Sequence, residues 1–339
     1  MEERTLAIRT ALITGIAGQD GVYLGRFLVS RGYRVVGTVT SKARARQILD
    51  AYLPEAVPYQ IDVRNSDAMG VLLEREKPDE IYNLAAWSSV GRSWGDPEQV
   101  TAVNGLSLLG LLEQVKRLRD ADGYDPRICQ ASSSEMFGLV PSLPQTEDSP
   151  HHPRSPYAVS KSFAHHTAIN YRESYGMYVA VAILFNHESP LRPASFVTRK
   201  ITKGAAAIAL GRQEVLTLGR LDVRRDWGAA ADYVEAMHLI MQSPEPDTYN
   251  VATGTSHSLR DFLRHAFSVA RVPDLDTRIV LDPSLLRPAD VPETRGDASK
   301  IHRALGWGPR FQFEGIVESM VRADMRRLKC GIEHDPKYL

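Results

Sequence analysis

The chain has 339 residues, of which 43% are hydrophobic and 24% are charged, an ordinary balance for a globular protein. With 41 basic and 41 acidic residues the formal net charge is zero, so no global field favours nucleic acid or a membrane surface as partner. No apolar run is long enough to span a bilayer, and the first residues lack the apolar core of a signal peptide. Cys129 and Cys330 are the only cysteines and belong to no metal-binding or redox motif. We therefore expect no metal site and a reducing, cytoplasmic compartment.

The first half of the chain alternates short apolar runs with amphipathic segments. Strands are expected at residues 10–14, 34–39, 57–61, 80–84 and 127–131. Helices are expected around residues 24–28, at 67–76 and from about 97 to 118. Such alternation predicts parallel βαβ units and an α/β fold, namely a Rossmann-type doubly wound parallel sheet.

Ser155 and Pro156 fit the N-cap and the first position of a further helix, which should run to about Tyr175 and stop at Gly176. A buried strand is expected at 179–185, and after it the pattern becomes irregular and proline-rich. We predict a dinucleotide-binding domain at residues 1–182, to which 229–256 return. Residues 183–228 and 257–339 would form a smaller α/β substrate-binding lobe.

A glycine-rich turn, Gly15-Ile16-Ala17-Gly18-Gln19-Asp20-Gly21, lies between the first expected strand and helix. Glycines let the backbone approach a pyrophosphate, and the N-terminus of the helix faces the anion. The G-x-x-G-x-x-G spacing is only moderately specific, and a structural turn with packing glycines is the alternative. The flanking strand and helix favour a dinucleotide site.

The end of the second expected strand favours NADP over NAD. An NAD enzyme usually places an acidic residue there for the ribose hydroxyl, whereas this chain continues with Ser41, Lys42, Arg44 and Arg46. These side chains suit a 2′-phosphate, although a solvated basic helix face gives the same pattern. At the end of the third strand, an adenine contact and a helix cap are equally good interpretations of Asp62, followed by Val63.

Tyr157 and Lys161 stand one helical turn apart, so both project from one face of their helix. A nearby ammonium and a positive nicotinamide ring would favour the Tyr157 phenolate, a base for a sugar hydroxyl. Ser133 and Glu135 follow the strand expected at 127–131, where they would hydrogen-bond the reacting oxygen and move a carbon-bound proton. A polar turn and a carboxylate at a helix N-terminus are the alternatives for these two residues. The four together indicate an enzyme that oxidises a sugar transiently in order to remove water from it.

On these motifs the sequence resembles the GDP-mannose 4,6-dehydratase family, of the extended short-chain dehydrogenase/reductase superfamily, from about residue 10 to 325. The most specific stretches are 130–138, RSPYAVSK at 154–161, NYRESYGMY at 170–178, LFNHESP at 184–190, FVTRKIT at 196–202, RDWG at 225–228 and RPA at 287–289. The resemblance implies NADP as cofactor and GDP-mannose, or a close GDP-sugar, as substrate. It implies that Tyr157 deprotonates the 4-hydroxyl while NADP takes the C4 hydride. Glu135 then removes the C5 proton and assists the loss of water from C6, hydride returns to C6, and C5 is reprotonated to give GDP-4-keto-6-deoxy-mannose.

The resemblance also implies binding residues, and it makes Lys161 the group that lowers the pKa of Tyr157 and holds the nicotinamide ribose. Beyond the glycine turn, Lys42, Tyr157 and Lys161, cofactor positions fall on Asp62, Val63, Leu84, Ala85, Ala86, Ser88, His187 and Arg192. Substrate positions fall on Ser88, Ser133, Glu135, Asn186, Val197, Lys200, Arg225 and Arg287. A diphosphate needs cations, so we expect the arginines to clamp it, Arg225 first, with a surface ion pair as the alternative for each.

The chain departs from the family pattern at three places. Trp87-Ser88-Ser89 replaces Gln-Ser-His, and Trp87 is expected to reshape the nicotinamide or sugar pocket. Residues 191–194, Leu-Arg-Pro-Ala, replace Arg-Arg-Gly-Glu, and the basic loop after the second strand is shorter and lacks the usual Arg at Thr40. In relatives that loop reaches a neighbouring subunit's cofactor. The sequence therefore favours a homodimer through the helices at 97–118 and 156–175, with a tetramer as the alternative.

Other functions fit parts of this pattern. A nucleotide-sugar 4-epimerase or 4-ketoreductase needs Tyr157 and Lys161 but not Glu135. A dehydratase acting on a GDP-mannoheptose would share the whole set, and a catalytically silent nucleotide-binding module would need none of it. Nucleotide-glucose dehydratases usually carry Asp where Ser134 stands, which argues against a glucose substrate. The intact set favours the GDP-mannose reaction.

Overall fold

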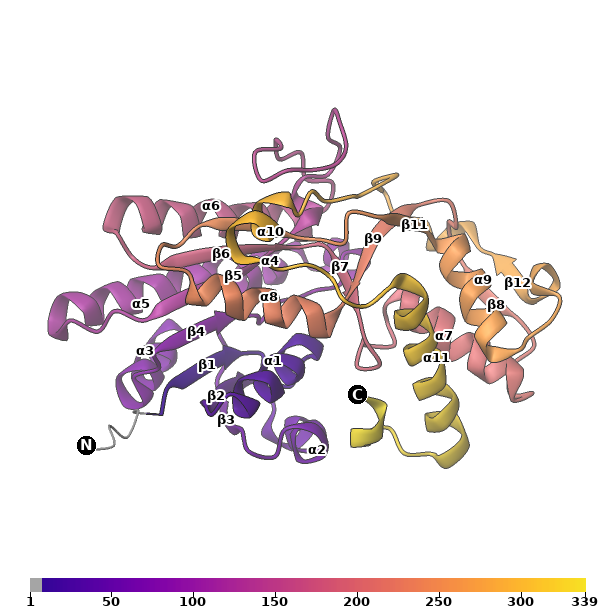
Figure 1. Cartoon of the computed structure of the whole chain (residues 1–339), viewed down its shortest axis with the longest axis horizontal. Helices are drawn as coiled ribbons and strands as arrows, with labels where there is room; N and C mark the ends of the chain where they lie inside the picture. The colour runs from indigo at the N-terminus through magenta and orange to yellow at the C-terminus, as the bar shows by residue number, and fades with distance from the viewer. Residues whose placement is uncertain (1–7) are drawn as a thin grey trace.

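The structure, a computed structural model, describes residues 8–339 (Figure 1). The expectation about a signal peptide concerns the first residues of the chain, and residues 1–7 lie outside this range. Within residues 8–339, no helix is both long enough and apolar enough to cross a membrane.

A seven-stranded parallel sheet forms the larger part of the molecule, in the order β10-β6-β5-β4-β1-β2-β3. Its strands are β1 (Thr10–Thr14), β2 (Arg34–Val39), β3 (Val57–Gln60), β4 (Glu80–Asn83), β5 (Arg127–Ser133), β6 (Val179–Leu184) and β10 (Thr248–Val251). The central strands are buried on both faces, as their continuous apolar runs require. The expected Rossmann-type sheet is confirmed, and β5 extends two residues beyond its expected end, so that Ser133 closes the strand.

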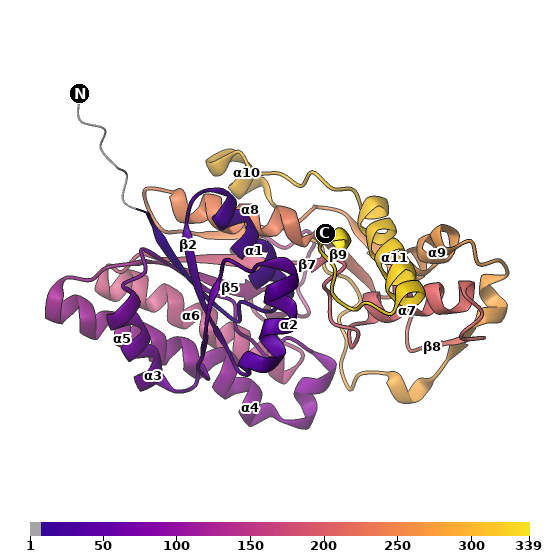
Figure 2. The ribbon, with the colours of Figure 1, turned by 90° about the horizontal axis from the view of Figure 1, so that it is seen from below.

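Helices cover both faces of this sheet (Figures 1 and 2). They are α1 (Gln19–Ser30), α2 (Lys42–Tyr52), α3 (Ser66–Glu76), α4 (Pro97–Thr101), α5 (Ser107–Asp122), α6 (Pro156–Tyr175) and α8 (Ala230–Gln242). α3, α4, α5 and α6 pack together on one face, and α1 packs with α8 on the other. The single helix expected at 97–118 is interrupted by a π-helical turn at Ala102–Leu106. The ends expected for α6 are confirmed, because Ser155 caps its N-terminus and Gly176 adopts φ +61° beyond its C-terminus.

The smaller lobe lies beside the carboxyl ends of the central strands. It contains a three-stranded sheet, β11-β9-β7, built from β7 (Asn186–Glu188), β9 (Arg224–Ala229) and β11 (Ser256–Ser258). A parallel pair is formed by β8 (Leu216–Leu218) and β12 (Ile279–Leu281). Three helices, α7 (Val197–Ala209), α9 (Leu259–Ala270) and α11 (Phe313–Cys330), pack on one another around a second apolar core. These long helices lie in the stretch whose sequence pattern looked irregular.

The two cores indicate where the chain divides. β10 pairs with β6 in the larger sheet, and α8 packs against that sheet. Both lie in the segment, residues 229–256, expected to return to the larger domain. Ile301, in the short helix α10 (Ser299–Leu305), and Trp307, just after it, also pack in the larger core. We propose the domain division given above, with residues 298–307 assigned to the larger domain.

Candidate active site

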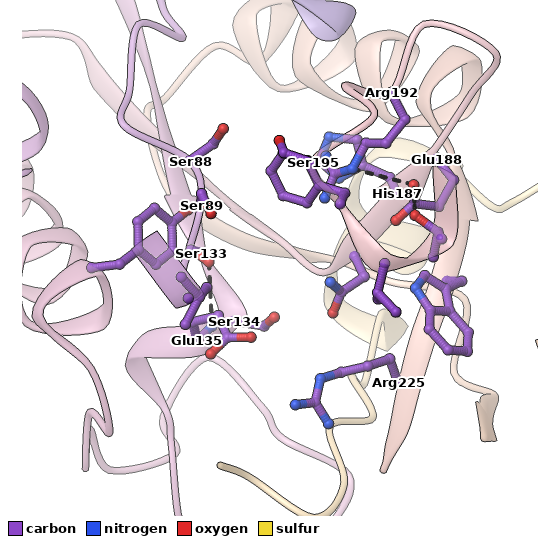
Figure 3. A pocket seen from close by; sticks show the side chains of 18 of the residues that line it. Ser88, Ser89, Ser133, Ser134, Glu135, His187, Glu188, Arg192, Ser195 and Arg225 are labelled. Carbon is purple, nitrogen blue, oxygen red and sulfur yellow. Dashed lines mark hydrogen bonds and ion pairs between the residues drawn. The ribbon is translucent and has the colours of Figure 1, made fainter. Parts of the chain in front are cut away.

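A pocket of about 400 Å³ opens between the two lobes. One wall comes from the ends of β4 and β5 and carries Ser88, Ser133 and Glu135. The opposite wall comes from the smaller lobe and carries His187, Glu188, Arg192 and Arg225 (Figure 3). Because ligands of doubly wound sheets bind outside the carboxyl ends of the strands, this is the position expected for a cofactor and substrate site.

The four expected catalytic residues line this pocket together. Tyr157 and Lys161 project from the first turns of α6, and both side chains are buried. The Lys161 ammonium donates to the backbone carbonyl of Ala131, at 2.9 Å. Ser133 ends β5, and its hydroxyl accepts the backbone N–H of Glu135 at 3.3 Å, which places Glu135 in the short 3₁₀ turn Ser134–Met136.

Burial is the largest cause of the pKa shifts of both Tyr157 and Lys161. Burial raises the pKa of Tyr157 to about 12; a hydrogen bond to Ser133 opposes the rise, Glu135 adds to it, and Arg192 lowers it slightly. Burial lowers the pKa of Lys161 to about 8, opposed by the charge of Asp20. The net shift at Tyr157 is upward because burial outweighs the neighbouring charges. The expectation that Lys161 lowers the pKa of Tyr157 stays a prediction.

A buried polar ladder that the sequence analysis missed supports this wall. The Thr14 hydroxyl donates to Asn83 at 2.9 Å, and Asn83 donates to Gln130 at 2.7 Å. Gln130 in turn donates to the Ala131 carbonyl, the acceptor that also holds Lys161. Thr14 accepts the backbone N–H groups of Leu84 and Ala85, so the ladder fixes a stretch expected to bind cofactor. The signal in the sequence is a polar residue at the end of β1 and of β4, and one inside the otherwise apolar run of β5.

The glycine turn has the geometry of a pyrophosphate cradle. Gly15 adopts φ +72°, and a Cβ on Gly21 would lie 2.6 Å from the Gly15 carbonyl oxygen, so both positions require glycine. Gly18 is the N-cap of α1 and offers no side-chain oxygen, which leaves the N–H groups of the first turn available to an anion. The turn therefore fits the pyrophosphate of a dinucleotide.

The residues after β2 and β3, which were expected to contact the 2′-phosphate and the adenine, differ in how free their side chains are. Lys42, Arg44 and Arg46 are exposed on α2 and make no ion pair within residues 8–339, whereas the Ser41 hydroxyl is used to cap that helix. Asp62 forms an ion pair with Arg64, which engages both of its carboxylate oxygens, and Asn65 rather than Asp62 caps α3. Val63 packs against the larger core.

The Trp87 loop reaches the pocket through its neighbours. Ala86, Ser88 and Ser89 line the pocket, but Trp87 is not among the described residues that do so. Its backbone N–H and carbonyl are held by the side chain of Asn104, in the π-helical turn. Asn104 also donates to Ser160 at 3.0 Å, which connects this loop to α6.

The wall from the smaller lobe is rich in cations and includes Asn186, Val197, Lys200, Arg225 and Arg287. Arg225 is buried and already donates to the carbonyls of Arg224 and Val291 and to the Asp290 carboxylate. A free bidentate clamp at Arg225 is therefore not what the structure shows. The one ion pair that Arg287 makes among residues 8–339 is with Asp290, at 3.6 Å, so its guanidinium is more available than that of Arg225.

Two ion pairs lie at the back of this wall, one between Glu188 and Arg192 and one between His187 and Asp20. Glu188 pairs with Arg192 at 3.2 Å, and the Arg192 guanidinium stacks 3.7 Å from the Phe196 ring centroid. His187 lies 2.9 Å from Asp20. Burial raises the pKa of Asp20, but the charge and hydrogen bond of His187, with Gln19 and Arg192, outweigh burial and hold it at about 2. Burial lowers the pKa of His187, and Asp20 reverses the effect, so that the net shift is upward.

Comparison with known proteins agrees with this geometry. A family model described as GDP-mannose 4,6 dehydratase matches residues 12–320, nearly the whole chain. The chain belongs to the GDP-mannose 4,6-dehydratase family. GDP-mannose 4,6 dehydratase 1 of Arabidopsis thaliana is 43% identical over 330 residues, covering 95% of this chain and 91% of that protein. The human GDP-mannose 4,6 dehydratase is 39% identical over 346 residues, covering 95% and 92%.

Solved structures of other nucleotide-binding proteins have the same fold as this chain. RMD from Pseudomonas aeruginosa, solved with NADPH, matches with a TM-score of 0.79 and 27% identity, over 94% of this chain and all of that one. A dTDP-glucose 4,6-dehydratase from Bacillus anthracis, solved with NAD, matches with a TM-score of 0.81 at 19% identity, covering 95% and 98%. At that identity the second likeness concerns the fold alone.

Proposed function

We propose that this chain is an NADP-dependent hydro-lyase that converts GDP-mannose into GDP-4-keto-6-deoxy-mannose. The observation that carries the proposal is the position of Glu135. It shares one pocket wall with Ser133, Tyr157 and Lys161, opposite a cationic wall, in a chain of the GDP-mannose 4,6-dehydratase family. A carboxylate at this place adds a proton-transfer group to an oxidising pair.

NADP would lie with its pyrophosphate on the glycine turn and its 2′-phosphate toward Lys42, Arg44 and Arg46, and it supplies the acceptor and later the donor of one hydride. Lys161 would hold the nicotinamide ribose. Tyr157 takes the proton of the 4-hydroxyl, with Ser133 donating to the reacting oxygen. Since its pKa is about 12, Tyr157 becomes a base when further positive charge comes close, such as that of an oxidised nicotinamide.

Glu135 carries the second half of the reaction. A ketone at C4 acidifies the C5 proton, which the Glu135 carboxylate removes and then delivers to the departing C6 hydroxyl. The hydride taken from C4 then returns to C6 and a proton is added at C5, which gives GDP-4-keto-6-deoxy-mannose with no net redox change. Lys200, Arg287 and the remaining N–H groups of Arg225 bind the diphosphate. Asn186 and Val197 line the pocket between them and are proposed sugar contacts.

Glu135→Gln tests this assignment, because the amide keeps the shape of the carboxylate and loses its proton transfer. We expect water loss to slow by about 10²–10⁴-fold, while oxidation at C4 continues and reduced cofactor accumulates on the enzyme. Glu98→Gln, on the exposed surface of α4, is the matched control and should retain full turnover. A 4-epimerase or 4-ketoreductase would survive Glu135→Gln, so full activity of that variant would overturn the dehydratase proposal.

We also propose that the chain forms a homodimer through α6. Val159 and Phe163 on α6 leave 53% and 41% of their surface exposed, and Leu106 in the neighbouring π-helical turn leaves 52%. Phe163 packs beside Gly105, the neighbour of Leu106, and Val159 stands one helical turn before Phe163. A second copy would cover these exposed apolar side chains. Phe163→Glu should yield a monomer in sedimentation analysis, whereas Phe311→Glu, at an exposed site in the loop before α11, should not. A dimer that persists in Phe163→Glu would exclude this interface.

A reducing, cytoplasmic compartment is proposed on separate grounds. Cys129 is buried in the sheet, Cys330 is exposed at the end of α11, and both are free thiols. Burial raises the pKa of the Cys129 thiol to about 12, which keeps it protonated and inert.

A further inference from the structure

Four side chains connect the glycine turn to the smaller lobe, and we call them the interlobe joint: Gln19 and Asp20 at the start of α1, and His187 and Ser189 beyond β6. The Gln19 amide donates to the His187 carbonyl at 3.2 Å and to Asp20 at 3.0 Å. The Ser189 hydroxyl donates to the Gln19 carbonyl oxygen at 2.9 Å. Gln19, His187 and Ser189 are all buried, so these bonds are shielded from water.

The position of Gln19 changes the role that the family resemblance implied for it. The resemblance places Gln19 among cofactor residues, but its side chain bonds to the smaller lobe through both its amide nitrogen and its amide oxygen, with one further bond to Asp20, and does not line the pocket. Its backbone, in contrast, begins the helix whose first turn faces the pyrophosphate. Gln19 therefore belongs to the cofactor turn through its backbone and to the smaller lobe through its side chain.

On the far side of the joint, the chain continues directly into the cationic wall. Arg199, on α7, donates to the carbonyls of Pro190 at 3.0 Å and of Arg192 at 2.8 Å. The ion pair between Glu188 and Arg192 closes the same short segment, which is thus held at both ends. α7 also carries Val197 and Lys200, the proposed substrate contacts. An unbroken series of contacts runs from the glycine turn to the residues that face the substrate.

We propose that Gln19 is a positioning residue, and that through the interlobe joint the binding of NADP raises the affinity for the GDP-sugar. The proposal rests on the proposed function, because it takes both ligands from there. A pyrophosphate on the turn fixes the start of α1, and the joint then fixes residues 187–192. Because the cationic wall is then already ordered, less conformational entropy of the protein is lost when the GDP-sugar binds. Linkage requires that the GDP-sugar raise the affinity for NADP by the same factor.

The experiment measures GDP binding by calorimetry, with and without saturating NADPH, and NADPH binding by fluorescence, with and without saturating GDP. Ser189→Ala removes the bond to Gln19 and the acceptor of the Leu191 backbone N–H, at a residue that lies outside the glycine turn and does not line the pocket. Gln19→Leu removes all of the bonds that the Gln19 side chain makes. Ser30→Ala, at the exposed C-terminal end of α1, is the matched control.

For the unaltered chain and for Ser30→Ala, we expect NADPH to lower the Kd of GDP by about fivefold or more. In Ser189→Ala, NADPH should lower the Kd of GDP by less than about twofold, and the Kd of GDP measured without NADPH should be unchanged. In Gln19→Leu, NADPH should leave the Kd of GDP about the same. If the unaltered chain bound both ligands but NADPH did not change the Kd of GDP, the coupling would be overturned and the proposed function would stay intact. The coupling would also be overturned if NADPH lowered the Kd of GDP in the two variants as much as in the unaltered chain, or if the variants bound GDP more weakly to the same extent with and without NADPH. Failure of the unaltered chain to bind either ligand would overturn the proposed function, and the coupling with it.

Discussion

Replacing Gly21 by alanine should damage the cofactor turn, by an amount that follows from the structure. A Cβ at this position would lie 2.6 Å from the carbonyl oxygens of Gly15 and Ile16 and from the Ile16 Cα. Overpacking costs about 1–3 kcal/mol, and three backbone contacts place this site near 3 kcal/mol, because backbone atoms cannot turn aside. The better helix propensity of alanine returns at most about 1 kcal/mol. The net destabilisation is thus about 2 kcal/mol.

Thermal unfolding and NADPH titration measure the effect. With an unfolding entropy of about 2.1 cal/mol/K per residue, 339 residues give about 0.7 kcal/mol/K, so the Tm should fall by about 3 °C. The Kd of NADPH should rise by about tenfold or more, equivalent to about 1.4 kcal/mol, because the displaced backbone is the part that approaches the pyrophosphate.

Gly18→Ala is the matched control for this prediction. Its Cβ would meet only the Gly15 carbonyl oxygen, at 3.2 Å, and its φ of −76° suits any residue. We expect a loss below about 1 kcal/mol, typical of an N-cap glycine replaced by alanine. If Gly21→Ala matched Gly18→Ala in both Tm and NADPH affinity, the steric reasoning about this turn would be refuted.

Two further predictions concern stability. Asp324→Asn should lower the free energy of unfolding in urea by about 3–5 kcal/mol, because the buried Asp324 carboxylate pairs with both Arg199 and Arg327. Asp222→Asn, which breaks an exposed ion pair with Arg220, should leave the free energy of unfolding unchanged. Equal stability of the two variants would contradict the prediction. Burial lowers the pKa of His151 to about 4 and that of His165 to about 3, with neighbouring imidazoles adding to both shifts. Both are neutral when folded and protonate near pH 6.5 when unfolded, so stability should fall as the pH drops from about 6.5 to about 4. His151→Asn should flatten that slope, and an unchanged slope would exclude His151 as a cause.

The sequence was sufficient for features that are local along the chain. β1 and β2 match their predicted bounds, and β3, β4 and β6 each differ at one end by a single residue. For all of these except the edge strand β3, the reason is that buried parallel strands form apolar runs. The caps of α6 could be predicted because Ser155, Pro156 and Gly176 act on their immediate neighbours. The same reasoning found the glycine turn and the spacing of Tyr157 and Lys161.

Features that depend on distant contacts could not be predicted in this way. The ladder of Thr14, Asn83 and Gln130 requires the strand order β1-β4-β5, which the alternation of elements does not specify. Arg225 looked like a free cation until the fold brought Asp290 beside it. The pKa of Tyr157 depends on burial between two lobes, a quantity that its spacing from Lys161 does not contain.

The central claim is that the chain removes water from GDP-mannose by a transient oxidation. The most direct test is mass spectrometry of GDP-mannose labelled with deuterium at C4, incubated with the purified protein without added reductant. We predict a product that has lost one water and kept the deuterium, now at C6, with no net formation of NADPH. Unchanged GDP-mannose, from a protein that binds NADP, would contradict the substrate assignment, and a dehydrated product without the deuterium would contradict the return of the same hydride.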